Sequence, residues 1–141
     1  MLDDTFLVIT YARDVFREPQ IILFSNDVER AASFYASIGF VESFRVPERG
    51  TPIHVDLVMD GYKIGIASVE STRDDHGLDP VADGQRAAVV LWTDDVDRAF
   101  ETMTADGCPG LVPPHVWLER LKIAWVADPD GYPIQVVQSL I

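Results

Sequence analysis

The chain has 141 residues and is 48% apolar, so it is long enough to bury a core and is not a disordered chain. Lys and Arg number 11 against 23 Asp and Glu, and the net charge of −12 argues against binding to nucleic acid or to an anionic membrane. The acidity fits either a role in keeping the protein dissolved or attraction of a cationic ligand, and both interpretations stay open.

The first part of the chain is an extension followed by a compact unit. The apolar pattern of residues 1–19 fits either a short helix capped by Asp3 or Asp4 or an extra strand. Residues 20–69 predict a strand at 20–25, then a helix that starts at Asn26, with Glu29 at capping-box spacing, and ends before Gly39. Three further strands are predicted at 40–46, 53–59 and 63–69, the last two joined by an Asp-Gly turn at 60–61.

The second part repeats this order after a linker. Residues 70–86 carry five acidic residues and two glycines, which predicts an exposed connection. Residues 87–141 predict a strand at 88–93 and a helix that starts at Asp94, with Asp97 in the capping position, and ends before Gly107. Strands at 110–118, 121–127 and 133–139 follow, with a turn at 128–131.

The two units are copies of one pattern. Residues 21–28 read Ile-Ile-Leu-Phe-Ser-Asn-Asp-Val, and residues 89–96 read Val-Val-Leu-Trp-Thr-Asp-Asp-Val. An apolar strand, a polar cap, a helix and a later Asp-Gly turn therefore occur twice in the same order. The sequence predicts an α+β protein of two tandem βαβββ modules.

Four short segments carry a family resemblance. Residues 26–35 read Asn-Asp-Val-Glu-Arg-Ala-Ala-Ser-Phe-Tyr, and residues 38–40 read Ile-Gly-Phe. Residues 94–99 read Asp-Asp-Val-Asp-Arg-Ala, and residues 128–134 read Asp-Pro-Asp-Gly-Tyr-Pro-Ile. Over residues 20–139 the chain resembles the vicinal oxygen chelate superfamily of glyoxalases, bleomycin-resistance proteins and dioxygenases. The resemblance implies a curved mixed sheet around a cavity, helices outside it, and pairing as a homodimer.

The resemblance also implies where a divalent metal would bind. Enzymes of the family take one ligand from the first and one from the last strand of each module, and the matching positions here are Gln20, Gly65, Ala88 and Gln135. Glycine and alanine have no side-chain donor, and two neutral amides leave no carboxylate to balance a divalent charge. We therefore expect no metal and no other cofactor, and whether the chain is an enzyme stays open.

The expected cavity wall is neutral and partly aromatic. If Gln20 points inward, Phe24 shares its face by period-two alternation, and Trp92 likewise shares the face of Ala88. The resemblance implies that Trp125, just before the turn at Asp128, also faces the ligand, and Gln135 adds a second amide to the wall. Such a wall suits a flat ligand with a few hydrogen-bonding groups. Aromatic residues also pack cores, so both interpretations remain open for these positions.

Two histidines are further candidates. His54 and Asp56 lie two apart on a predicted strand, so they share a face and form either a polar dyad in the cavity or ordinary surface residues. His115 follows two prolines in a loop-like stretch that could reach the cavity rim. We include His54 among the candidate ligand-binding residues, which are Gln20, Phe24, His54, Trp92, Trp125 and Gln135.

The location of the protein is inferred from missing signals. Cys108 is the one cysteine, so no disulfide forms within the chain. The first residues lack the basic start and long apolar core of a secretory signal, and no segment approaches the ~18 apolar residues of a membrane span. We expect a cytoplasmic protein.

Three functions fit the sequence. The first is a metal-independent module, similar to bleomycin-resistance proteins, that binds a small, partly aromatic ligand without turnover. A cationic, antibiotic-like compound is one such ligand, and its binding would confer antibiotic resistance. The alternative is a metal-dependent lyase, isomerase or dioxygenase with an atypical metal site at Gln20, His54, Asp56 or Gln135. The third is a structural dimer with a vestigial cavity. The expected partners are the small molecule and a second copy of the chain.

Overall fold

The computed structural model describes residues 17–141, and the choice between helix and strand for the N-terminal extension therefore falls almost wholly outside the described residues. The first module comprises β1 (Ile21–Ser25), α2 (Val28–Ser37), β2 (Val41–Val46), β3 (His54–Met59) and β4 (Tyr62–Ser68). After α3 (Val69–His76), the second module comprises β5 (Val89–Trp92), α4 (Val96–Ala105), β6 (Gly110–Trp117), β7 (Leu121–Ala127) and β8 (Pro133–Ser139).

Each module forms one four-stranded mixed sheet. The strand orders are β1-β4-β3-β2 and β5-β8-β7-β6, so the first strand of each module pairs in parallel with its last strand. The remaining pairs are antiparallel hairpins, and the Asp60-Gly61 turn has positive φ at both residues. These observations confirm the α+β class and the duplicated βαβββ order. Between residues 17 and 141 no strand pairing joins the two sheets.

The two long helices begin one residue later than the capping pattern predicts. Their N-caps are Asp27 and Asp95, whose carboxylates accept hydrogen bonds from the backbone N–H groups of Arg30 and Arg98, each at 3.1 Å. The prediction that Asn26 and Asp94 are the caps was therefore wrong. Both helices end before a glycine with positive φ, as predicted.

The linker holds a helix that the sequence analysis missed. Residues 69–76 form α3, with the Ser68 side chain as N-cap and Gly77 in the left-handed conformation at its end. Only Val69 and Thr72 of this helix are buried. Its sequence therefore needs no apolar stripe, which is the pattern that usually indicates a helix. Glu70 and residues 73–76 of this helix are exposed, and residues 77–88 contain no helix or strand.

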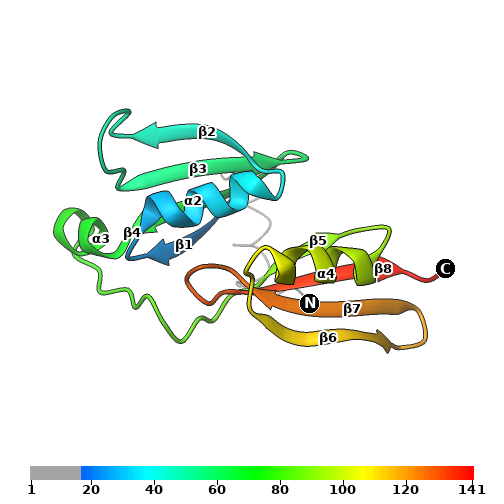
Figure 1. The fold of residues 1–141 in the computed structure, drawn as a ribbon. Helices are drawn as coiled ribbons and strands as arrows, with labels where there is room; N and C mark the ends of the chain where they lie inside the picture. The colour runs from blue at the N-terminus through cyan, green and yellow to red at the C-terminus, as the bar shows by residue number, and fades with distance from the viewer. Residues whose placement is uncertain (1–16) are drawn as a thin grey trace, which may run out of the picture.

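One face of each sheet is covered by the helix of its module, and in Figure 1 α2 and α4 lie in front of their sheets. The strands contribute Leu23, Leu57 and Ile66 beneath α2, and Ala124, Ile134 and Val136 beneath α4, all with 2% exposure or less. These residues belong to one buried cluster that spans both modules. Since one face of each sheet packs against its helix, the opposite face of that sheet points away from this core.

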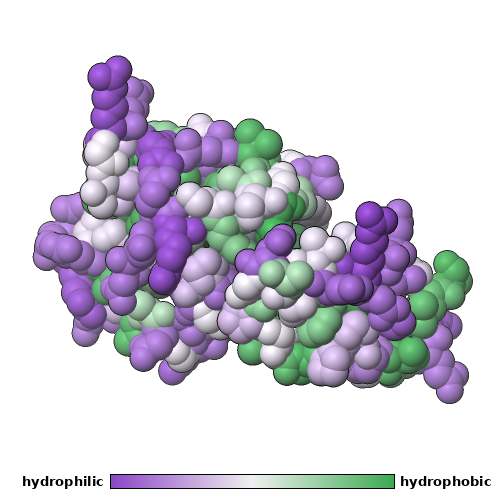
Figure 2. Space-filling model, viewed as in Figure 1, coloured by the Kyte–Doolittle hydropathy of each residue, from purple (hydrophilic) through white to green (hydrophobic). Residues whose placement is uncertain are grey.

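The helical side of the molecule is largely hydrophilic, with apolar patches along the edge where β6 runs and at the C-terminal end (Figure 2). The large apolar residues on and just after β6 are at least 40% exposed: Leu111, Val112, Val116, Trp117 and Leu118. No helix within residues 17–141 is long and apolar enough to cross a membrane.

Candidate functional site

Each sheet has a face turned away from its helix, which we call its open face. Residues paired across strands point to the same side, so the register defines each face. The first open face carries Ile22, Phe24, Phe44, His54, Asp56, Lys63, Gly65 and Ala67. The second open face carries Val90, Trp92, Val112, His115, Trp117, Ile123, Trp125, Gln135 and Val137.

A polar cluster lies on the first open face. Asp56 Oδ1 accepts a hydrogen bond from Gln20 Nε2 at 3.0 Å and lies 2.7 Å from His54 Nε2. The side chains of His54 and Asp56 are 25% and 14% exposed. His54 and Asp56 therefore share the face on which Gln20 lies, and they contact each other. That this pair faces a ligand stays a prediction.

A glycine makes room for this cluster. Gly65 pairs with Asp56 across β3 and β4, and its missing side chain is the reason that three side chains converge there. A Cβ at this position would lie 3.0 Å from both Asp56 Oδ1 and Gln20 Nε2, and 3.2 Å from His54 Cε1. The space that a side chain at position 65 would occupy is therefore already taken by polar groups.

The second open face is aromatic. All three tryptophans of the chain lie on it, and Trp92 and Trp117 are 65% and 51% exposed. Trp125 pairs directly with Gln135 on β8, which in turn pairs with Val90 on β5. This row places one amide between an indole and an aliphatic side chain, an arrangement suited to a flat ligand with a hydrogen-bonding group.

The six candidate residues from the sequence separate into two groups of three. Gln20, Phe24 and His54 lie on the first open face, and Trp92, Trp125 and Gln135 lie on the second. No hydrogen bond between described residues links the two groups. The structure thus places every candidate on an open face, and each sheet supplies a different chemistry.

His115 lies on the edge strand β6 and not in a loop. It pairs with Ile123, is exposed, and its Nδ1 lies 2.9 Å from the carbonyl oxygen of Pro113. It is on the second open face, at the edge away from β5. The expected loop is therefore a strand, and the place of His115 at a cavity rim stays a prediction.

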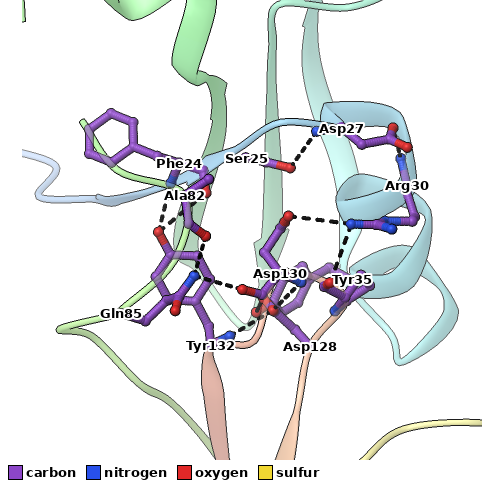
Figure 3. Close-up of polar contacts among 11 residues, drawn as sticks. Phe24, Ser25, Asp27, Arg30, Tyr35, Ala82, Gln85, Asp128, Asp130 and Tyr132 are labelled. Carbon is purple, nitrogen blue, oxygen red and sulfur yellow. Dashed lines mark hydrogen bonds and ion pairs between the residues drawn. The ribbon is translucent and has the colours of Figure 1, made fainter. Parts of the chain in front are cut away.

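A buried polar network joins the modules, and the sequence analysis did not predict it (Figure 3). The Tyr35 hydroxyl donates to Asp128 Oδ2 at 2.7 Å, and Asp128 Oδ1 accepts from the backbone N–H groups of Asp130 and Tyr132. Phe24 N–H donates to the Tyr132 hydroxyl at 3.0 Å. The Asp-Pro-Asp-Gly motif was the available signal, because its first carboxylate organises the turn and reaches the other module.

Two further contacts complete this junction. Arg30 on α2 lies 3.6 Å from Asp130 Oδ1 and donates to the carbonyl oxygen of Pro129. Gln85 of the linker donates to the carbonyl oxygen of Asp130 at 2.6 Å. The first module, the linker and the second module therefore meet at one turn, shown in Figure 3.

Burial at the junction changes the titration of its groups. It raises the pKa of the Asp130 carboxyl above its usual value, although Ser25 and Arg30 act in the opposite direction. It also raises the pKa of Tyr35, with the Asp128 carboxylate adding to the effect, and the pKa of Tyr132. Both tyrosines therefore stay protonated and act as hydrogen-bond donors.

A hollow of about 860 Å³ lies elsewhere, between the modules. Its lining includes Met59 and Tyr62 from the β3–β4 hairpin, Trp92 from β5 and Arg98 from α4. Of the six candidate residues only Trp92 lines it. The hollow is therefore a second place where a ligand could contact the chain, and it needs its own test.

No group of three or more His, Cys, Asp or Glu side chains within the described residues is placed to hold a metal ion. At the four positions that the resemblance assigns to metal ligands, Gly65 and Ala88 offer no donor atom. The Gln20 amide is already bonded to Asp56. The residues present therefore do not fit a cation bound at these four positions.

Comparison with known proteins identifies the fold independently. The family model described as the Glyoxalase/Bleomycin resistance protein/Dioxygenase superfamily matches residues 17–136. No curated protein matches the chain. Among solved structures, TioX from Micromonospora sp. ML1 is similar at 24% identity and a TM-score of 0.70, over 89% of this chain and 100% of that one.

Two other solved structures have similar folds. A glyoxalase/bleomycin resistance protein/dioxygenase from Nocardioides is 18% identical with a TM-score of 0.69, over 96% of this chain and 93% of that one. Lactoylglutathione lyase from Agrobacterium tumefaciens is 18% identical with a TM-score of 0.66, over 84% of this chain and 90% of that one. At these identities the similarity establishes the fold alone.

Proposed function

The chain belongs to the Glyoxalase/Bleomycin resistance protein/Dioxygenase superfamily, and on that premise we propose that it binds a small, partly aromatic ligand on its open sheet faces without turning it over. The observation that carries this proposal is the row Val90, Gln135, Trp125 and Val112 on the second open face. It presents aromatic and aliphatic surface with one amide, and no charged group. A cationic, antibiotic-like compound fits the net charge of −12, and resistance by sequestration would follow.

The absence of turnover is proposed from the donor set. Catalytic metal sites usually keep three protein ligands, and the inherited positions offer only the amides of Gln20 and Gln135. The space above Gly65 is occupied by the side chains of Asp56 and Gln20. A ligand held by stacking and hydrogen bonds alone contacts no metal ion that would activate it as a Lewis acid. We therefore expect the ligand to bind and to be released unchanged.

Tryptophan fluorescence tests the proposal directly, because all three tryptophans lie on the second open face. The protein is titrated with a panel of glycopeptide and other planar antibiotics. We expect a saturable change for at least one compound, with a dissociation constant below about 1 mM. If every compound in the panel fails to bind more tightly than that, the proposal is wrong.

We also propose that two copies of the chain associate through β6. Large apolar side chains on and just after this edge strand are at least 40% exposed, and exposed apolar patches mark interaction surfaces. Pro113 and Pro114 lack backbone N–H donors, so association there uses side chains more than strand pairing. A Val116→Lys variant should be monomeric by light scattering while the unchanged chain is dimeric, and a monomeric unchanged chain would contradict the proposal.

The same reasoning limits the other partners. The net charge of −12 opposes contact with nucleic acid or anionic lipid, and neither is proposed as a partner. We propose that the protein acts in the cytoplasm, since its one cysteine, Cys108, is a free thiol that burial and nearby acids keep protonated by raising its pKa.

The second candidate function is a metal-dependent lyase, isomerase or dioxygenase with an atypical site. The observation that favours it is the convergence of Gln20, His54 and Asp56, which brings an amide, an imidazole and a carboxylate together. Metal analysis of protein purified without chelator separates the two functions. Our first proposal predicts less than one metal ion per ten chains, and a stoichiometric transition metal would replace it with the second.

A further inference from the structure

Among residues 17–141, the polar cluster on the first open face leaves one strong acceptor, Asp56 Oδ2, without a donor. Asp56 Oδ1 accepts from Gln20 and from the Nε2 of His54, whereas no described residue donates to Oδ2. The Asp56 side chain is 14% exposed, so this oxygen has lost much of its water. A carboxylate oxygen in such a place gains from a charged donor that a ligand supplies.

The neighbours of Asp56 in its row define what that ligand looks like. Across the sheet the row runs Phe44, Asp56, Gly65 and Ile22. Phe44 is 52% exposed and Ile22 is 44% exposed, and the glycine between them adds no side chain. The carboxylate therefore lies between an aromatic ring and an aliphatic side chain, which favours a positive charge carried on an apolar body.

The first open face carries few charged residues, so the effect of each charge on the binding of a cation can be measured separately. Apart from Asp56, the first open face carries one charged residue among the described strands, Lys63, which pairs with Val58 one row away. No ion pair joins Lys63 to Asp56. His54 already directs its Nε2 toward Asp56. A bound cation would therefore be attracted by Asp56 and repelled by Lys63.

We propose that Asp56 receives the positively charged group of the ligand, so that the ligand class is an organic cation: an ammonium, amidinium or guanidinium on an aromatic or aliphatic body. This inference rests on the proposed function and names the chemistry of its ligand. The cation donates its N–H groups to Oδ2, while Phe44 and Ile22 cover its apolar part. The net charge of −12 increases the rate of encounter at low salt.

The probes are benzamidinium and its neutral counterpart benzamide, which have nearly the same shape. Binding is followed by NMR through the side-chain amide of Gln20 and the ring protons of His54, which report on the cluster itself. We expect benzamidinium to bind about tenfold more tightly than benzamide. Equal affinity of the two probes overturns the inference.

Three variants change one charge each. Asp56→Asn keeps an acceptor for Gln20 and His54 but removes the charge, and it should weaken benzamidinium binding about tenfold. Lys63→Gln removes the repelling charge and should strengthen binding about twofold. Asp60→Asn is the matched control in the β3–β4 turn, where φ is +49° and Asn is tolerated, and it should change nothing.

The outcomes separate this inference from the proposed function. Unchanged affinity in Asp56→Asn, or equal losses in Asp56→Asn and Asp60→Asn, overturns the inference. If Asp56→Asn does not fold, the Lys63→Gln variant is the deciding test. The inference is then overturned if Lys63→Gln binds benzamidinium no more tightly than the unchanged chain. The proposed function survives these results as long as the tryptophans respond to an aromatic compound, and it fails only if they respond to none.

Discussion

The two modules have the same strand order but opposite chemistry on their open faces. The first carries Asp56, His54 and a contacting Gln20, whereas the second carries three tryptophans around one amide. The helix-covered faces, by contrast, are apolar in both modules. The strand residues buried in the core are therefore apolar in both modules, whereas the open faces differ between them. The open faces are therefore the regions where we propose that the ligand binds.

The largest expected effect concerns the polar contacts around Asp128 that join the two modules, which we call the junction. Removing the Asp128 carboxylate tests whether these contacts, and not either open face, hold the modules together. Asp128 is 3% exposed and accepts three hydrogen bonds, from Tyr35 and from two backbone groups. Asp128→Ala leaves these donors unpaired and should lower the free energy of unfolding by about 3 kcal/mol. Urea denaturation measures it.

The matched control for this variant is Asp97→Ala, which removes an exposed carboxylate that pairs with Lys122. An ion pair whose acid is 62% exposed contributes little, so a loss of about 0.5 kcal/mol is expected. Equal losses in the two variants would show that the junction is not a special contact.

The second prediction separates the aromatic face from the hollow between the modules. Trp125→Leu removes an indole from the open face alone, and Tyr62→Leu removes an 81% exposed ring from the lining of the hollow alone. We expect ligand affinity to fall about tenfold in Trp125→Leu and to stay unchanged in Tyr62→Leu. The reverse result would place the ligand in the hollow.

The third prediction concerns the polar face. Gly65→Ala adds a Cβ within 3.0 Å of Asp56 and Gln20, and these side chains must move apart. The atoms that must move are the ends of side chains. The free energy of unfolding should therefore fall by about 1 kcal/mol, near the low end of the range for overpacked positions. The ring protons of His54 should shift in NMR spectra, and the tryptophan emission of the second face should not. Unshifted His54 signals would show that the cluster does not depend on the glycine.

The smallest effects come from two acids with opposite pKa shifts. Burial raises the pKa of Asp130, so its contribution to stability is present below its unfolded value and is lost as the pH rises through the folded value. The hydrogen bond from Arg45 lowers the pKa of Glu29, so its contribution is present above the unfolded value and is lost as the pH falls through the folded value.

Removing each charge should therefore change the pH dependence of stability in opposite directions between about pH 3 and pH 6. Relative to the unchanged chain, Asp130→Asn should be more stable at the upper end of this range than at the lower end. Glu29→Gln should be relatively less stable there, by a few tenths of a kcal/mol at most, because its side chain is 53% exposed. Thermal unfolding across this range measures both, and shifts of the same sign would contradict the assignment.

Most of the fold was predictable because its signals are local. Within residues 17–141, the eight strands and both long helices lie within two residues of the predicted bounds, since repeated apolar runs and Asp-Gly turns mark them. The helix at residues 69–76 was missed because only two of its residues are buried. The caps were placed one residue early because neighbouring Asn and Asp residues offer equivalent side chains, and only the backbone geometry selects Asp27.

The sheet face of each candidate residue was predictable from the sequence, but the contacts between these residues were not. Alternation correctly assigned Gln20, Phe24 and Trp92 to the faces away from the helices. It could not show that Gln20 bonds to Asp56, since that contact depends on the register between three strands and on the empty position at Gly65. Nor could it show that the Tyr35 hydroxyl reaches the other module, because that contact depends on how the two modules pack.

The central claim, that the open faces bind an aromatic ligand without turnover, is tested most directly by one titration. Tryptophan emission is recorded as planar antibiotics are added, and each bound compound is then recovered and weighed by mass spectrometry. The account predicts a saturable change for at least one compound, with a dissociation constant below about 1 mM and an unaltered mass on recovery. No saturable change, or a compound recovered in chemically altered form, would contradict it.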